Sequence, residues 1–213
     1  MTEPAGTIPA PILADPVMAA LAARHGPCPI PTRDGHDPYQ SLMRAIVYQQ
    51  LSGKAAGTIL RRTLALFGIE GEEGGSPDPA RLIATPDEDL RACGLSRQKT
   101  AALKDLAARR LDGTVPDNHA IDHLHDDEIV QRLTAVRGVG RWTVEMYLMF
   151  TLGRTDVWPV DDLGVRKGWM IAHGLPAMPA PKAFTTMADH LRPWRSHAAW
   201  YCWRAVDTVT PDS

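Results

Sequence analysis

The sequence predicts an all-α protein, and three observations lead to this prediction. Apolar residues recur at spacings of three and four along most of the chain, as they do on one face of a helix. Proline, serine, aspartate and glycine stand where such segments begin and end. No segment alternates apolar and polar residues convincingly with period two, as a half-buried strand would. The 213 residues are enough for one sizeable core, or for two small lobes that share a cleft.

In the first half of the chain, residues 1–12 are rich in proline and are expected to form a loose tail. Pro38 suits the first position of a helix, where its missing N–H is not needed. Gly68 ends the following helix, and residues 70–78 form an acidic, glycine-rich loop. Ser96 is the expected N-cap of a long helix. The helices predicted in this half cover residues 16–24, 38–51, 54–67, 79–84, 87–92 and 97–111.

In the second half, residues 114–125 carry no periodic pattern and are expected to be irregular. The next helix starts at Asp126, with Ile129 and Leu133 toward the core. Residues 141–152 are apolar nearly all round, so this helix is expected to be buried. The remaining predicted helices run from Asp161 to about His173 and over residues 181–191 and 194–209.

The composition is typical of a soluble globular protein, with 44% apolar and 23% charged residues. No apolar run reaches the roughly 18 residues that a membrane-spanning helix needs. The N-terminus lacks the basic and apolar regions of a secretion signal, so a cytoplasmic protein is expected, associated with the nucleoid if it is bacterial. Cys28, Cys93 and Cys202 are scattered, without metal-ligand spacing and without an even disulfide set, which fits a reducing compartment.

The charge is uneven, although the formal net charge is only −2. Residues 70–89 carry seven acidic side chains and one arginine, whereas residues 91–110 carry six lysines and arginines and one aspartate. The basic segment, with Lys99 in it, is a candidate for contacts with phosphates. The alternative is an ordinary solvated helix face.

The segment Gly138-Val-Gly140 lies between two helical patterns. The two glycines permit a tight turn with positive φ. Such a turn exposes backbone N–H groups at the start of the next helix, which then binds an anion. A tight interhelical connection without a ligand is the alternative. The candidate groups for gripping a DNA phosphate are those of Gly138, Val139, Gly140, Arg141 and Thr143.

Two consecutive carboxylates, Asp161 and Asp162, follow twenty residues after Trp142 at the start of a predicted helix. Aspartate is a common N-cap, and a cap alone would explain one of them. With two, one can cap the helix while the other points into a cleft, and the helix N-terminus favours its negative charge. An anion-binding turn and a nearby acid on a helical chain indicate an enzyme that acts on nucleic acid.

Six tryptophans are many for this length, and most are expected in the core. Trp200 and Trp203 lie three residues apart on the last helix and are expected to face one direction. An aromatic slot is what an extruded base needs, and it also attracts a cationic base. The segment from Gln49 to Ser52 lies between two helices, where a residue at the tip could wedge into a base stack, or where the chain simply turns.

Taken together, these segments resemble the helix-hairpin-helix DNA glycosylase superfamily, most closely its 3-methyladenine DNA glycosylase II branch. The resemblance covers roughly residues 38–207. Its most specific elements are Val136-Arg-Gly-Val-Gly-Arg-Trp-Thr143, Asp156-Val-Trp-Pro-Val-Asp-Asp162 and Pro193-Trp-Arg-Ser196 leading to Trp203, with support from residues 44–52 and 94–99. The resemblance implies two helical lobes with a cleft between them: residues 13–213 as one domain, with about 53–155 as one lobe and the N-terminal helix with the C-terminal helices as the other.

The resemblance also assigns roles by position. Asp162 matches the catalytic aspartate, with Asp161 as the fallback. Trp142 stands where bifunctional members carry a Schiff-base lysine, and since an indole forms no imine, lyase activity is expected to be absent. Gln50 or Leu51 falls at the intercalating wedge. The expected base pocket comprises Trp142, Trp203, Tyr48, Met146 and Arg195.

The implied activity is hydrolysis of the N-glycosidic bond of alkylated bases such as 3-methyladenine and 7-methylguanine, flipped out of double-stranded DNA. A monomer without membrane association is expected. No cofactor is required; a sodium or potassium ion on the carbonyls of Thr134, Val136 and Val139 is compatible with the hairpin. Only Cys202 lies where other branches carry four cluster-binding cysteines, so no iron–sulfur cluster is expected.

Three alternatives stay open at this level. The enzyme could instead remove deaminated or mismatched bases such as hypoxanthine or uracil. The hairpin could serve a DNA-binding module without catalysis. The chain could also be a structural helical protein whose tryptophans are core residues and whose aspartates are caps.

Overall fold

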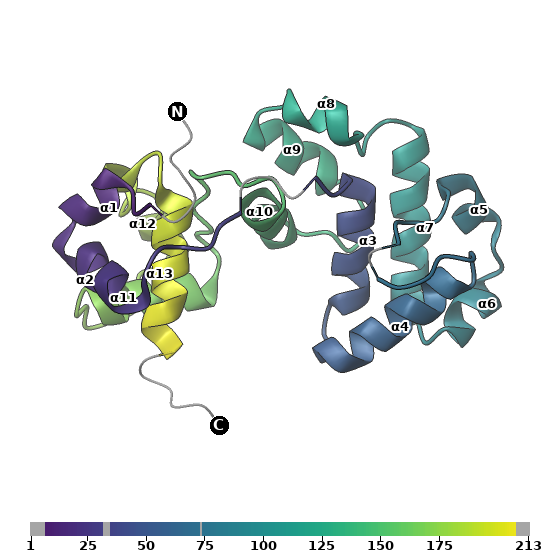
Figure 1. Ribbon diagram of the computed structural model, residues 1–213, viewed down its shortest axis with the longest axis horizontal. Helices are drawn as coiled ribbons and strands as arrows, with labels where there is room; N and C mark the ends of the chain where they lie inside the picture. Colours follow the sequence, from purple (N-terminus) through teal and green to yellow (C-terminus); the bar gives the residue numbers. More distant parts are fainter. Residues whose placement is uncertain (1–6, 32–34, 73, 208–213) are drawn as a thin grey trace. The chain divides into compact units, whose positions relative to one another are not determined.

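The computed structural model describes residues 7–31, 35–72 and 74–207 and contains only helices, turns and loops over these ranges (Figure 1). The all-α prediction is therefore confirmed. Contacts between Cα atoms divide the chain into two compact units. Unit 1 comprises residues 1–34 and 148–213, and unit 2 comprises residues 35–147. These boundaries differ from the expected lobe of residues 53–155, because the helix that begins at Pro38 belongs to unit 2.

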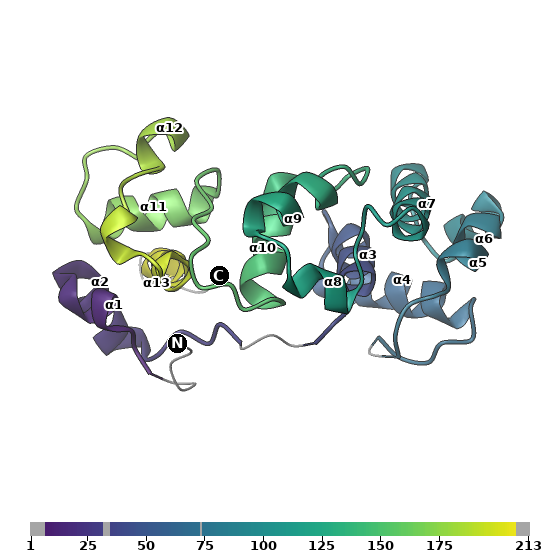
Figure 2. The same ribbon diagram turned by 90° about the horizontal axis from the view of Figure 1, so that it is seen from above.

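Unit 2 is built on the long helix α7, against which α3, α5 and α6 pack (Figures 1 and 2). Leu42, Ile46, Leu103 and Leu106 are buried between these helices, at spacings that place each pair on one helix face. The helices of this unit are α3 (Pro38–Tyr48), α4 (Gly53–Ala65), α5 (Pro79–Ala84), α6 (Asp87–Ala92), α7 (Arg97–Leu111), α8 (Asn118–Asp122), α9 (Asp126–Leu133) and most of α10 (Arg141–Phe150).

Unit 1 is organised around the last helix, which packs against α11 and α2. Tyr201 is fully buried there, and its hydroxyl donates a hydrogen bond to the carbonyl of Gly26 across 175 residues of sequence. The N-terminal helices therefore complete the core of the C-terminal ones. The elements are α1 (Ala10–Ala14), α2 (Pro16–His25), α11 (Leu163–Ala172), α12 (Pro181–Phe184), the 3₁₀ helix η1 (Asp189–Leu191) and α13 (Arg195–Asp207).

Five local predictions were wrong. The single helix expected over residues 181–191 is broken: α12 ends at Phe184, and the 3₁₀ helix η1 follows after a turn. The expected tail over residues 1–12 includes the start of α1, because Ile12 is fully buried; residues 1–6 lie outside the described ranges. The region expected to be irregular contains α8, which Asp117 caps. Helix α3 ends at Tyr48, before the expected Leu51. Helix α10 is not buried all round, since Trp142 is 51% exposed.

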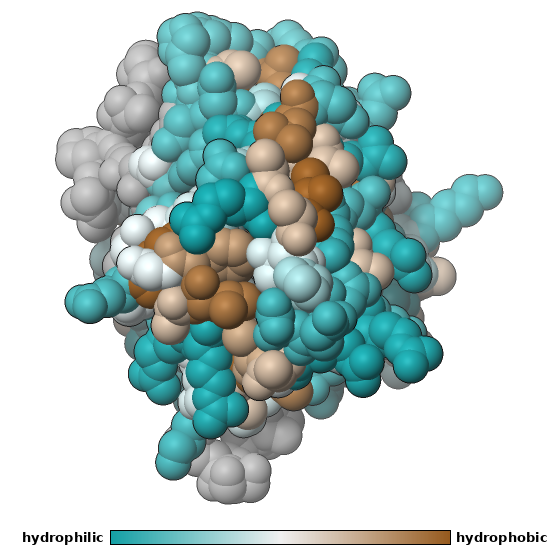
Figure 3. Space-filling model, turned by 90° about the vertical axis from the view of Figure 1, so that its right-hand side faces the viewer, coloured by the Kyte–Doolittle hydropathy of each residue, from teal (hydrophilic) through white to brown (hydrophobic). Residues whose placement is uncertain are grey.

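Figure 3 views the α5 and α6 side of the molecule, where hydrophobic residues form a narrow, interrupted band on a largely hydrophilic surface. Scattered exposed apolar side chains of this kind are usual on folded proteins. Within the described part of the chain, no helix combines the length and the apolar character that crossing a lipid bilayer would require.

Candidate active site and nucleic-acid interface

The carboxylate of Asp162 lies at the start of α11 and caps it. Its backbone is extended, with φ −69° and ψ 119°, and its Oδ1 accepts a hydrogen bond from the N–H of Val165 at 2.7 Å. The residue is only 8% exposed, whereas Asp161 beside it is exposed. The capping residue is thus the same aspartate that the resemblance assigns to catalysis, and the helix N-terminus favours its negative charge.

Trp203 fixes the orientation of this carboxylate. Its indole Nε1–H donates to Oδ1 of Asp162 at 3.0 Å. The ring also packs against Phe150, with ring centroids 6.0 Å apart. Because one oxygen accepts both a backbone and an indole N–H, the carboxylate plane has little freedom to rotate. Trp203 therefore packs on Phe150 and also holds the carboxylate of Asp162 in place.

Two glycines in α11 allow α13 to approach closely enough for this contact. A Cβ at Gly164 would lie 2.8 Å from Cδ1 of Trp203 and 3.2 Å from Oδ1 of Asp162. A Cβ at Gly168 would clash with the backbone carbonyl of Cys202. The four-residue spacing places both glycines on the face of α11 that meets α13. Burial, and then the nearby charge of Asp162, raise the pKa of the Cys202 thiol, which therefore stays protonated.

Arg195 lies at the start of α13 and forms hydrogen bonds with the loop that leads to Asp162. Its Nε donates to Oδ1 of Asp156 at 2.7 Å, and its Nη2 donates to the carbonyl oxygen of the same residue at 3.0 Å. Ser196 adds two bonds: its hydroxyl donates to the Arg154 carbonyl and accepts the N–H of Val157. Arg195 was expected in the base pocket; its observed contacts fasten this loop to α13.

The hairpin between α9 and α10 was only partly predicted correctly. Gly138 has the expected positive φ of 78°, but Gly140 does not, because it leads directly into α10 and its carbonyl accepts the N–H of Val144. The N–H of Val139 was expected to bind phosphate. It is already donated to the Val136 carbonyl at 3.1 Å, which closes the turn. The N–H of Arg137 is likewise bound, by Oδ2 of Asp105 at 2.7 Å.

The turn between α3 and α4, residues Gln49 to Ser52, is called the wedge turn here. Gln50 has φ +58°, the one positive φ of a non-glycine residue in the described ranges. Such backbone conformations are costly and gather at functional sites. Leu51 beside it is 40% exposed. The side-chain amide of Gln49 donates to the carbonyl of Gly138 at 2.9 Å and so ties the wedge turn to the hairpin.

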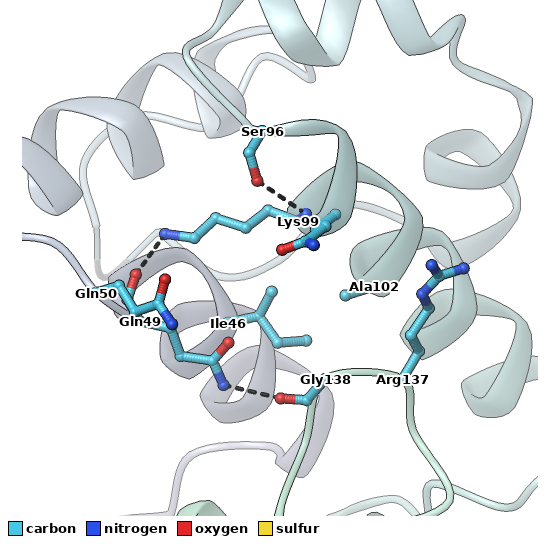
Figure 4. Close-up of a pocket in the computed structure, with 9 residues that line it drawn as sticks. Ile46, Gln49, Gln50, Ser96, Lys99, Ala102, Arg137 and Gly138 are labelled. Atoms are coloured by element: carbon cyan, nitrogen blue, oxygen red, sulfur yellow. Dashed lines mark hydrogen bonds between the residues drawn. The ribbon is translucent and has the colours of Figure 1, made fainter.

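A pocket of about 280 Å³ lies in unit 2 between the wedge turn, the N-terminal end of α7 and the hairpin (Figure 4). Ile46 and Ala102 supply apolar surface, and the other lining groups are polar. The pocket therefore brings together the wedge turn and the hairpin, which the sequence singled out separately. Its polar lining residues are Gln49, Gln50, Ser96, Gln98, Lys99, Arg137 and Gly138.

Two cationic side chains expected at the DNA backbone have protein partners. The Lys99 ammonium donates to the carbonyls of Val47 and Gln49 at 2.6 and 2.7 Å, at the C-terminal end of α3. Burial lowers the pKa of this ammonium. Arg141 donates to the buried carboxylate of Glu145 at 2.9 Å, one turn further along α10. Because its guanidinium is 57% exposed, Arg141 still reaches solvent.

The remaining candidates for a base pocket lie in unit 2. Trp142 is the most exposed of them, and Met146 on the next turn of α10 is half-buried. The hydroxyl of Tyr48 donates to Glu72 at 2.7 Å, and this hydrogen bond raises the pKa of the phenol. The guanidinium of Arg44 lies over the same ring, 4.5 Å from its centroid. Tyr48 therefore has a polar partner from the acidic loop.

The other tryptophans have mainly structural contacts. Trp158 and Trp169 are buried together with Phe184. Trp200 and Trp203 were expected to form one aromatic face, but they have different partners. Trp200 packs against Tyr201 and lies under Arg204, whereas Trp203 faces Asp162.

Sequence reasoning placed Gln49 in the wedge segment without a role of its own, and it missed Gly164. Gly164 and Gly168 form a small-residue pair one helical turn apart, which is a readable signal for close helix packing. Gln49 carried no such signal, because its partner is a carbonyl 89 residues away.

Comparison with known proteins places this geometry in a family. The family model for "HhH-GPD superfamily base excision DNA repair protein" matches residues 43–193. That range includes the wedge turn, the hairpin and Asp162. The chain therefore belongs to the HhH-GPD superfamily of base excision DNA repair proteins.

Individual relatives point in the same direction. DNA-3-methyladenine glycosylase 1 of Schizosaccharomyces pombe is 39% identical over 168 residues, which is 79% of this chain and 72% of the relative. A crystal structure of a DNA-3-methyladenine glycosidase from Bacillus halodurans matches with a TM-score of 0.80 and 32% identity, covering 93% of this chain and 88% of that one. The S. pombe 3-methyladenine DNA glycosylase in complex with abasic DNA matches with a TM-score of 0.72 and 36% identity, covering 89% and 91%.

Proposed function

We propose that this protein is a DNA glycosylase that hydrolyses the N-glycosidic bond of alkylated bases, of the 3-methyladenine and 7-methylguanine type, in double-stranded DNA. The observation that carries the proposal is the arrangement of Asp162. A carboxylate that is nearly buried at a helix N-terminus, and held by the Trp203 indole, has a fixed position and a favoured negative charge. The names of the relatives support the substrate class.

The chemistry follows from the charge that develops during the reaction. An N3- or N7-alkylated purine already carries positive charge and is a good leaving group, so it needs little protonation. As the C1′–N bond breaks, the base takes the bonding electrons and positive charge develops on the sugar. A preorganised carboxylate stabilises this charge without reorganising. Asp162 performs this role and orients the attacking water, whose oxygen bonds to C1′ while its proton passes to the solvent.

In this proposal, unit 2 binds the DNA. The hairpin and the first turn of α10, from Gly138 through Thr143, offer backbone N–H groups to a phosphate. The N–H of Val139 is excluded from this role by its bond to Val136. Gln50 and Leu51 form the wedge that fills the space left by a flipped nucleotide. Flipping costs a few kcal/mol, and least where alkylation has weakened pairing or stacking.

Trp142 contacts the base and cannot form an imine, so the product is an intact abasic strand. A sodium or potassium ion would be held by the carbonyls of Thr134, Val136 and Val139. The Val136 carbonyl already accepts one hydrogen bond and would use its second lone pair. The enzyme acts as a monomer, with no iron–sulfur cluster.

The test is incubation with methylated duplex DNA and, in parallel, with duplexes that contain hypoxanthine or uracil, followed by identification of the released bases. Release of 7-methylguanine and 3-methyladenine, with no strand cleavage before alkali, is the expected result. Release of hypoxanthine or uracil alone would instead identify a glycosylase for deaminated bases. Salt-sensitive DNA binding without any base release would identify a binding module. Absence of both activities would contradict any role on DNA.

A further inference from the structure

The C-terminal end of α3 has an unusual cap. The last carbonyls of a helix have no partner within the helix and carry partial negative charge. Here the carbonyls of Val47 and Gln49 both accept hydrogen bonds from one ammonium, that of Lys99, which comes from α7 some fifty residues later. The ammonium is partly removed from water by this position. One side chain therefore pins the helix end from which the wedge turn departs (Figure 4).

The residue that follows this pinned end is in a costly conformation. Gln50 at φ +58° needs surrounding contacts to hold it, since a side chain in the left-handed region is strained. Gln49, directly before it, is held twice: its carbonyl by Lys99 and its side-chain amide by the Gly138 carbonyl. The wedge turn is thus anchored on one side to α7 and on the other to the hairpin.

We propose that Lys99 and Gln49 are positioning residues for base extrusion: they lock the strained wedge turn to α7 and to the hairpin, so that the wedge enters the duplex without reorganising. This inference rests on the proposed function. It also changes the role expected for Lys99 from a phosphate contact to a support of the wedge. Two of the three donors of its ammonium point at protein carbonyls.

The experiment compares one lesion in two settings. Single-turnover excision of 7-methylguanine is measured opposite cytosine and opposite an abasic analogue, where no base pair has to be broken. Lys99→Met keeps the aliphatic stem and removes the ammonium. It is expected to slow excision about tenfold in the paired setting and less than about threefold in the unpaired one. Lys99→Arg, which retains donors, is expected to restore much of the lost rate.

Lys104→Met is the matched control. Lys104 lies on the same helix, but its ammonium bonds to Asp87 of α6, away from the wedge turn. It is expected to change both rates by the same small factor. Equal losses of Lys99→Met on the two substrates, or no loss on either, would overturn the inference.

Salt dependence separates positioning from phosphate binding. The slope of log K against log salt is negative, and loss of one phosphate contact lowers its magnitude by about 0.9. Lys99→Met is expected to leave the slope at the wild-type value, and a drop of that size would assign Lys99 to a phosphate and refute the inference.

If Lys99→Met fails to fold, Gln49→Met removes only the exposed hydrogen bond to the Gly138 carbonyl and is expected to show the same paired-substrate defect. If the wild type releases no base, the proposed function fails by itself. The fluorescence of 2-aminopurine in a duplex then reports extrusion directly, and Lys99→Met is expected to reduce its rise on binding. An unchanged rise would refute the positioning role.

Discussion

The two units present their functional groups in different ways. In unit 1, the candidate catalytic group is a side chain, Asp162, and its partners are fixed by tight packing of α11 on α13. In unit 2, the candidate DNA-contacting groups lie on two turns, and these turns are held by side chains that donate hydrogen bonds to backbone carbonyls. The difference shows where precision is needed. Bond cleavage depends on one charge at one place, whereas DNA binding depends on the conformation of short turns.

The largest effect is expected on the rate of base release, in the variant Asp162→Asn. An amide oxygen can still accept both the Val165 N–H and the Trp203 indole N–H, so the cap and the fold are expected to persist. Removing one preorganised electrostatic group typically costs about 10²–10³ in rate. Single-turnover base release should fall by this factor with unchanged DNA affinity. Asp161→Asn, at the exposed neighbour, is the matched control and should change the rate less than about twofold.

The second test compares the two glycines of α11. In Gly168→Ala the new methyl group meets the Cys202 backbone, which cannot move without separating the helices. The cost should reach about 3 kcal/mol of unfolding free energy. In Gly164→Ala the methyl group meets the Trp203 side chain, which can shift. We expect a smaller loss of stability and a fall in excision rate of about tenfold. Denaturant melts and kinetics on both variants distinguish these outcomes, and equal stability losses would contradict the assignment.

A third test uses pH, because the units differ in their histidines. His197 in unit 1 is buried, and burial lowers its pKa to about 4 from the unperturbed 6.5. Between these values the unfolded chain binds the proton and the folded chain does not. Stability is therefore fully present above pH 6.5 and falls as the pH is lowered, by about 3 kcal/mol in total near pH 4.

The matched variant is His197→Leu, which should flatten this part of the curve of unfolding free energy against pH. The histidines of unit 2, His36, His119, His123 and His125, are exposed. An acid-induced loss that persists unchanged in His197→Leu would show that another group is responsible.

The smallest change in stability is expected from Gln50→Gly in the wedge turn. Glycine adopts positive φ without steric strain, so the variant should keep its melting temperature or gain stability of at most about 1 kcal/mol. Excision from paired DNA should nevertheless fall severalfold, because the wedge loses its side chain. Gln50→Asn, whose side chain tolerates the left-handed region, is the control for backbone strain. A loss of stability in Gln50→Gly would mean that its side chain, rather than its conformation, matters for the fold.

The sequence by itself determined most of the helices and the identity of the main candidates. Local signals were sufficient where the cause was local: the residue ranges of α5, α6 and α7 match those read from Pro79, Asp87 and the Ser96 cap. The Asp161–Asp162 pair predicted a cap, and the structure places it on Asp162.

Only the tertiary structure decided which partners these residues have. The contacts of Asp162 with Trp203, of Lys99 with the end of α3, and of Gln49 with Gly138 join residues 41 to 89 positions apart. Helix propensity, capping and turn chemistry act over a few residues and cannot specify such pairs. They arise when helices pack, because buried polar groups must then find partners in the protein.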